Sequence, residues 1–161
     1  MGKLLDENSL DAVKTYVDDN DLFLYKHHYV MTTYPKVTQY WFDGSSYTSQ
    51  ALSAITTGDK YFDFISTSST PLNSIHELFT LDYNILGSIL LKAKNSTYKN
   101  FIYAGSVYVE EEVSGGTTQL VQYSRFIGFR AGGMLGYPWG VITIDFPYND
   151  TIASYTVTEM P

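Results

Sequence analysis

The segment from Phe101 to Phe129 constrains the fold of this chain more than any other, because its apolar residues alternate with polar ones around the turn Ser114-Gly115-Gly116. Side chains on a strand point to opposite faces in turn, so this alternation predicts a long antiparallel hairpin with one apolar face. A slip of one residue would set the apolar side chains against polar partners, so the pattern also predicts the register and an odd-numbered loop. The core residues expected from this hairpin are Phe101, Tyr103, Val107, Val109, Val121, Tyr123, Ile127 and Phe129.

The expected register pairs Val109 with Val121 and Val107 with Tyr123 near the tip of the hairpin. Toward its base, the same register pairs Tyr103 with Ile127 and Phe101 with Phe129. The acidic run Glu110 to Glu112 lies close to the turn, which predicts a tip that projects into water or toward a partner.

Short β-type segments separated by turn residues make up most of the remaining chain. Two hairpin turns are expected, one at Asp43-Gly44 and one at residues 57–60 between strands at 51–56 and 61–66. The spacing of Ser74 and Glu77 predicts a short helical turn. We therefore predict a mainly β domain over residues 22–161, an antiparallel β-sandwich or jelly-roll-like fold of about eight or nine strands. The other strands are expected at 22–34, 37–42, 85–93, 141–146 and 151–157, with a polar loop at 94–99.

The first 21 residues have helical spacing and are predicted to form a short amphipathic helix ahead of the β domain. Asn8 can cap this helix, and Leu10, Val13 and Val17 form one narrow apolar stripe. A stripe of this kind is covered either by the chain's own β domain or by another copy of the chain. We assign Leu10, Val13 and Val17 as candidate assembly residues of an N-terminal anchor or oligomerisation segment, residues 1–21.

The stretch Leu4 to Val17 resembles the openings of phage virion proteins of the tail-fibre, baseplate and head-fibre type. Those openings carry a Leu-Leu-Asp run, a turn residue, a Leu and a short Lys-containing helix; here Ser9 stands where Gly is usual, and Asp11-Ala12 where a bulky residue is usual. The resemblance implies a non-enzymatic virion structural protein, part of a fibre or appendage. It also implies a homo-oligomer, with a trimer favoured, that contacts other virion proteins.

Composition excludes several functional classes for the 161-residue chain. Its formal net charge is −7 with no cluster of Lys and Arg, so the basic surface of a nucleic-acid-binding protein is missing. Cysteine is absent, which rules out disulfides and thiolate metal sites, and no apolar run approaches the ~20 residues of a membrane span.

Catalytic signatures are also missing. His27 and His28 are adjacent in a predicted strand and should point to opposite faces, one buried and one solvated, so they do not form a single metal site. Asp63 and Asp145 both lie in predicted strands and could form the paired acids of a glycosidase, but their separation is not encoded locally. We predict no enzyme activity, no catalytic residue, no metal and no cofactor.

Aromatic residues near turns support an alternative function. Tyr47, Tyr137 and Trp139 are the candidate contacts for a ligand or partner, such as a glycan or a host surface receptor. The alternative is a carbohydrate- or surface-binding β-sandwich module of a bacterium, located in the cytoplasm or carried to the cell surface by a non-classical route.

Overall fold

The computed structural model describes residues 23–42, 47–51, 55–79, 85–131 and 139–161. Within these ranges the chain forms nine strands and one short 3₁₀ helix, and no α-helix. The strands are β1 (Tyr25–Met31), β2 (Lys36–Phe42), β3 (Tyr47–Ala51), β4 (Asp59–Ser66), β5 (Ile89–Lys94), β6 (Ser96–Val113), β7 (Thr117–Ala131), β8 (Trp139–Pro147) and β9 (Ile152–Glu159), and the 3₁₀ helix is Ile75–Phe79. The predicted N-terminal helix, residues 1–21 with Leu10, Val13 and Val17, lies outside the described residues.

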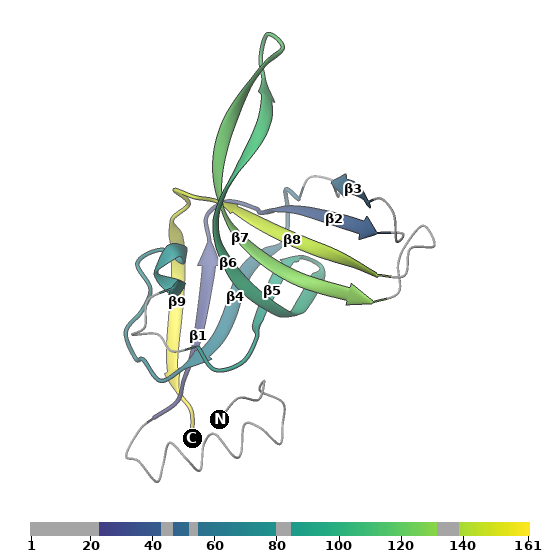
Figure 1. Ribbon diagram of the computed structural model, residues 1–161. Helices are drawn as coiled ribbons and strands as arrows, with labels where there is room; N and C mark the ends of the chain where they lie inside the picture. Colours follow the sequence, from purple (N-terminus) through teal and green to yellow (C-terminus); the bar gives the residue numbers. More distant parts are fainter. Residues whose placement is uncertain (1–22, 43–46, 52–54, 80–84, 132–138) are drawn as a thin grey trace.

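All nine strands belong to one sheet in the order β3-β2-β8-β7-β6-β5-β4-β1-β9, and each pairing is antiparallel. Strand β6 joins the two halves, because it pairs with β5 up to Phe101 and with β7 from Ile102 onward (Figure 1). The prediction of a mainly β antiparallel domain is thus confirmed. Hydrogen bonding defines a single sheet, not the two separate sheets of the predicted sandwich.

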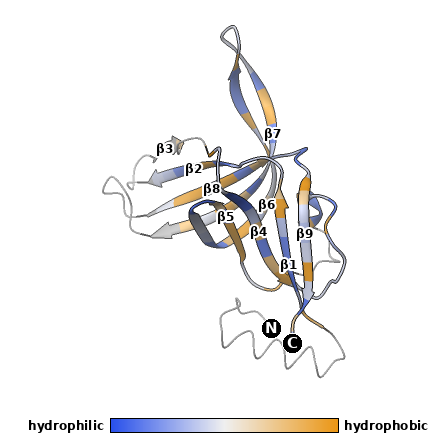
Figure 2. Ribbon diagram, turned by 180° about the vertical axis from the view of Figure 1, so that it is seen from behind, coloured by the Kyte–Doolittle hydropathy of each residue, from blue (hydrophilic) through white to orange (hydrophobic). Residues whose placement is uncertain are grey.

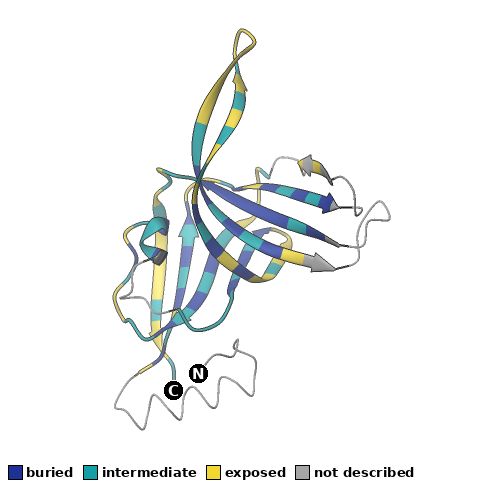
Figure 3. Cartoon of the chain, in the orientation of Figure 1, coloured by how far each residue is buried: buried dark blue, intermediate teal, exposed yellow. Residues whose placement is uncertain are grey.

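The core lies between the two halves of the sheet (Figure 3), and it combines aliphatic side chains with a set of aromatic rings that contact one another. Tyr29 of β1 stacks on Phe62 of β4 with ring centroids 5.2 Å apart. Phe62 in turn meets Phe126 of β7 at 5.4 Å and Phe146 of β8 at 6.5 Å. These contacts bring both halves onto one apolar core, and burial of such large rings is a major source of stability.

The register of the long hairpin is confirmed near its tip. Val109 pairs with Val121 and Val107 with Tyr123, and Val113 pairs with Thr117 around an odd-numbered loop. The loop glycines Gly115 and Gly116 have φ of 95° and 79°, a conformation that L side chains rarely adopt.

The register prediction is wrong at the base of the hairpin. A bulge between Tyr103 and Gly105 shifts the pairing, so Tyr103 lies opposite Phe126 and Ile127 opposite Ile102. Phe101 pairs with Ile89 of β5, while Phe129 pairs with Val141 of β8, because β6 changes its partner there.

Three further expectations meet different outcomes. The hairpin expected between 51–56 and 61–66 is wrong, because β3 pairs with β2 and β4 pairs with β1 and β5. The loop expected at 94–99 is a tight turn instead, since Ala93 pairs with Ser96 and β6 starts there. The helical turn after Ser74 is confirmed as the 3₁₀ helix, and Glu77 accepts a hydrogen bond from the Asn73 N–H at 3.2 Å.

Candidate functional site

The hairpin of β6 and β7 extends beyond the rest of the sheet as a two-stranded arm, residues 108–121 (Figure 1). Below the arm, β7 is paired on its other side with β8. This pairing ends where Tyr123 lies opposite Pro147, and one more hydrogen bond follows, from the Tyr148 N–H to the Gln122 carbonyl. An isolated two-stranded hairpin is marginal in water. A projecting arm of this length therefore needs support at its base or from a partner.

Hydrophobic positions occur along both strands of the arm (Figure 2), and the register places their side chains on both of its faces. On one face, Tyr108 is 65% exposed and Leu120 is 67% exposed. The other face carries the paired Val109 and Val121, both partly exposed. Exposed apolar residues gathered on one element are typical of a surface that contacts another molecule.

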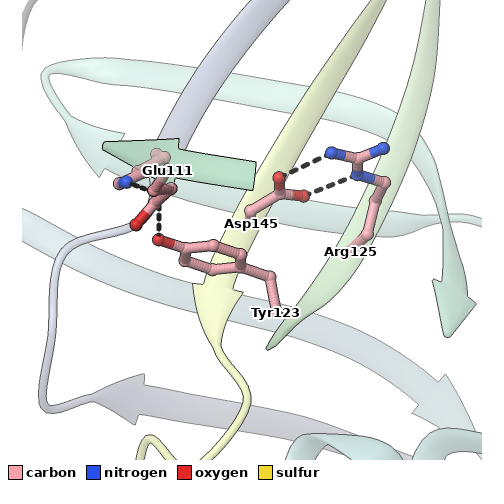
Figure 4. Close-up of polar contacts among 5 residues, drawn as sticks. Glu111, Tyr123, Arg125 and Asp145 are labelled. Carbon is pink, nitrogen blue, oxygen red and sulfur yellow. Dashed lines mark hydrogen bonds and ion pairs between the residues drawn. The ribbon is translucent and has the colours of Figure 1, made fainter. Parts of the chain in front are cut away.

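A polar cluster ties the arm to the sheet (Figure 4). The Tyr123 hydroxyl donates a 2.5 Å hydrogen bond to Glu111, and the Lys36 ammonium also donates to that carboxylate. The same ammonium lies 5.2 Å from the centroid of the Tyr123 ring, within cation–π range. The hydrogen bonds from Lys36 and then from Tyr123 lower the pKa of Glu111, so its carboxylate stays charged.

An ion pair lies next to this cluster on the same face of β7 and β8 (Figure 4). Arg125 Nε and Nη2 each donate a 2.8 Å hydrogen bond to a different oxygen of Asp145, directly across the strands. The Asp145 hydrogen bond raises the pKa of Arg125, and Asp145 itself is 5% exposed. This bidentate geometry anchors the outer surface where the arm begins.

The same face continues as an apolar patch. Arg125, Ile127 and Phe129 alternate along β7 without a register shift, so they share one face with Tyr123. Phe129 is 70% exposed, and Ile102, the partner of Ile127, is 59% exposed. We call this face of β6, β7, β8 and β2, which is continuous with the Val109 face of the arm, the outer face.

These positions correct the core predicted from the hairpin. Phe101, Tyr103 and Tyr123 are buried as expected. Phe129 is exposed instead, and Val107, Val109, Val121 and Ile127 are partly exposed, because they lie on the outer face or the arm and not between the halves of the sheet.

The two adjacent histidines point to opposite faces as predicted, although His28 is only partly exposed and not fully solvated. His27 is fully buried, with its Nε2 2.7 Å from the Ser68 carbonyl and its Nδ1 2.6 Å from the Tyr29 hydroxyl. These partners assign a neutral ring in which Nε2–H donates and Nδ1 accepts, and burial lowers the pKa of His27. His28 points to the other face, and its Nδ1 lies 2.5 Å from the Oδ1 of Asp63.

The two carboxylates of the candidate glycosidase pair each have their own basic partner. Asp63 of β4 lies against His28 of β1, whereas Asp145 of β8 is held by Arg125 of β7. Across the described ranges, His, Asp and Glu residues do not gather in a group of three or more that could hold a metal ion. In the part of the chain that the structure describes, no helix is long and apolar enough to span a bilayer.

The ligand-contact residues proposed from the sequence are not placed by the structure. Tyr137 lies outside the described residues, as do the side chains of Tyr47 and Trp139, whose backbones begin β3 and β8. The residues that sequence reasoning missed are Lys36, Ile102 and the outward-facing Phe129. For Ile102 and Phe129 the signal was the alternation itself, which defines two faces but does not say which one is buried. Nothing local to Lys36 marks it.

Comparison with protein-family models, with curated proteins and with solved structures finds no match for this chain.

Proposed function

We propose that this protein is a non-enzymatic structural component of a larger assembly, and that the arm of residues 108–121 makes its principal protein contact. The observation that carries this proposal is the projection of the arm beyond the sheet with Tyr108 and Leu120 both about two-thirds exposed, at 65% and 67%. Apolar area of this kind gains free energy when a partner covers it.

The construction of the arm supports contact with protein. Its two strands have outer edges whose backbone groups can pair with an added strand, a common mode of assembly. The cluster of Glu111, Tyr123 and Lys36 holds its base in one orientation, which lowers the entropy cost of docking. Glu110 and Glu112 keep the free arm soluble by opposing edge-to-edge aggregation.

The assembly we propose is a phage virion, with the protein in a fibre or appendage. This step rests on the resemblance of Leu4 to Val17 to the openings of such proteins. In this proposal the N-terminal stripe of Leu10, Val13 and Val17 attaches the chain or adds to its oligomerisation, a trimer being favoured, while the β domain, through its arm, contacts further copies of the chain, other virion proteins or a receptor. The predicted carbohydrate- or surface-binding module remains the alternative.

The test is the mass of the full-length chain in solution, by light scattering after size-exclusion chromatography. The wild-type chain should form a defined oligomer, and the double variant Tyr108→Ser with Leu120→Ser should lose it while keeping the wild-type melting temperature. The matched control is Tyr155→Ser on β9, a residue 53% exposed outside the arm, which should leave the mass unchanged.

A second variant, with Leu10, Val13 and Val17 all changed to Ser, tests the N-terminal segment separately. If it loses the oligomer while the arm variant keeps it, the contact belongs to the N-terminus and the assignment to the arm fails. If the wild-type chain is monomeric at every concentration, self-assembly is refuted as the role of the arm and of the N-terminal segment.

A further inference from the structure

A pocket of about 230 Å³ lies at the end of the sheet opposite to the arm, where β1 begins and β4 ends (Figure 1). Its apolar wall is formed by Ile65, Leu86 and Leu90, all of which are partly exposed and therefore open to contact. The Leu86 N–H donates a 2.8 Å hydrogen bond to the Ile65 carbonyl, which fixes the wall to β4. A cavity of ~150 Å³ accommodates a benzene ring, so this pocket, which we call the β4 pocket, has room for a protruding side chain of a partner.

The rim of the β4 pocket carries a lysine that is available to a partner. Lys26 is exposed, lies opposite Ile65 across β1 and β4, and forms no ion pair among the residues that the structure describes. Asp63, a carboxylate of the lining, is already engaged, because its Oδ1 lies 2.5 Å from the Nδ1 of His28. The pocket thus offers an apolar wall beside an available positive charge.

One face of the arm has the complementary composition. Glu110 of β6 lies opposite Leu120 of β7. Alternation along β6 puts Tyr108 and Glu112 on the same face, and all four side chains are exposed. Residues 108–121 contain no Lys, Arg or His. This face therefore combines large apolar side chains with negative charge, which is what the β4 pocket can accept.

We infer that this face of the arm docks in the β4 pocket of a second copy, where its apolar side chains meet the apolar wall and its two glutamates face Lys26. The inference rests on the arm being the principal contact, as proposed above, and it names the surface that the arm contacts. Complementary charge of this kind selects a partner and fixes its register, while the buried apolar side chains supply most of the affinity.

The arm and the β4 pocket lie at opposite ends of the sheet, so the contact joins different surfaces of two copies (Figure 1). A head-to-tail contact of this kind closes into a ring where the rotation between copies allows it, and otherwise continues as a filament. Closure after three copies would give the trimer proposed above.

The first test is the mass of the full-length Lys26→Glu variant, by light scattering after size-exclusion chromatography. Lys26 is exposed, so the replacement should leave the melting temperature unchanged. It sets like charges against one another and should raise the dissociation constant of the oligomer about tenfold. Adding Glu110→Lys and Glu112→Lys to this variant should restore the wild-type mass. The matched control is Lys99→Glu, the same charge change at an exposed residue outside the pocket, which should keep the wild-type mass.

The second test mixes two chains that each retain one half of the contact. Tyr108→Ser with Leu120→Ser damages the arm and keeps the pocket, whereas Lys26→Glu with Leu90→Ser damages the pocket and keeps the arm. Each variant alone should be monomeric, and the equimolar mixture should have the mass of two chains, because one intact contact joins them. Lys26→Glu alone takes the place of the pocket variant if Leu90→Ser lowers the melting temperature.

The inference is overturned if Lys26→Glu has the mass and dissociation constant of the wild type, or if the mixture stays monomeric. If the arm variant still loses the oligomer in that case, the arm makes the contact and only its docking surface is wrong. An arm variant that keeps the oligomer, or a monomeric wild type, instead refutes the proposed role of the arm and this inference with it.

Discussion

Replacing Arg125 by Met should destabilise the protein by removing the partner of a buried carboxylate. The Asp145 side chain is 7% exposed and that of Arg125 is 20% exposed, and both hydrogen bonds between them measure 2.8 Å. Removing one member of a buried ion pair typically costs about 3–5 kcal/mol, because the other charge stays buried without compensation. Since Arg125 is partly exposed and water can reach the gap it leaves, we expect about 3 kcal/mol.

The assay is urea denaturation, in which the free energy of unfolding is extrapolated to water. The double variant Arg125→Met with Asp145→Leu removes both charges and should recover most of the loss, because replacement of a whole buried pair by apolar residues is often neutral. The control is Lys92→Met. Lys92 lies 3.6 Å from Asp59, which is 62% exposed, so this pair should contribute less than about 1 kcal/mol.

Equal losses of unfolding free energy for Arg125→Met and Lys92→Met would refute the penalty for an uncompensated Asp145 charge. It is also refuted if the double variant is less stable than the single one, because the penalty would then come from packing of the outer face and not from an uncompensated Asp145 charge.

Three further predictions concern the core, the arm and the response to acid. Phe126→Ala should cost about 3–5 kcal/mol in urea denaturation, whereas Val109→Asp on the arm should cost less than about 1 kcal/mol; equal losses would place the arm in the core. Glu111 has a lowered pKa, so its contribution to folding stability is fully present above its ordinary pKa of 4.5 and is lost as the pH falls through the lower pKa of the folded state. The difference in stability between wild type and Glu111→Gln should therefore close at that lower pH. A difference that persists at the acid limit would contradict this. His27 also has a lowered pKa, so below its ordinary pKa of 6.5 the unfolded chain binds a proton that the folded chain does not. Stability should therefore fall with decreasing pH until the pKa of the folded state is passed. If the melting temperature of His27→Gln falls from pH 7 to pH 4 as steeply as that of the wild type, another group is responsible.

The part of the fold that followed from sequence was the part determined by local pattern. Val109 and Val121 were paired correctly because alternation and an odd-numbered loop determine register near a turn. The opposite orientation of His27 and His28 followed from the same period of two. Farther from the turn, the bulge after Tyr103 shifted the register by an amount that the alternation does not encode.

The candidate site was predicted less well than the fold, because it depends on contacts between distant segments. Glu111 was recognised as part of an acidic tip, but its partner Lys36 is 75 positions away in the chain. Likewise, the sequence marked Asp145 as a strand carboxylate without identifying Arg125 as its partner. Pairing of this kind is decided by strand order, which local periodicity does not contain.

By itself, then, the sequence determined a mainly β chain, a long acidic-tipped hairpin and the absence of cysteine chemistry, since these depend on residue types and on spacing within a few positions. Tertiary structure alone decided that β6 passes from one half of the sheet to the other and that Phe129 faces outward while Phe126 faces the core. The physical reason is that alternation gives every strand two faces, and only packing against the rest of the sheet determines which of them is buried.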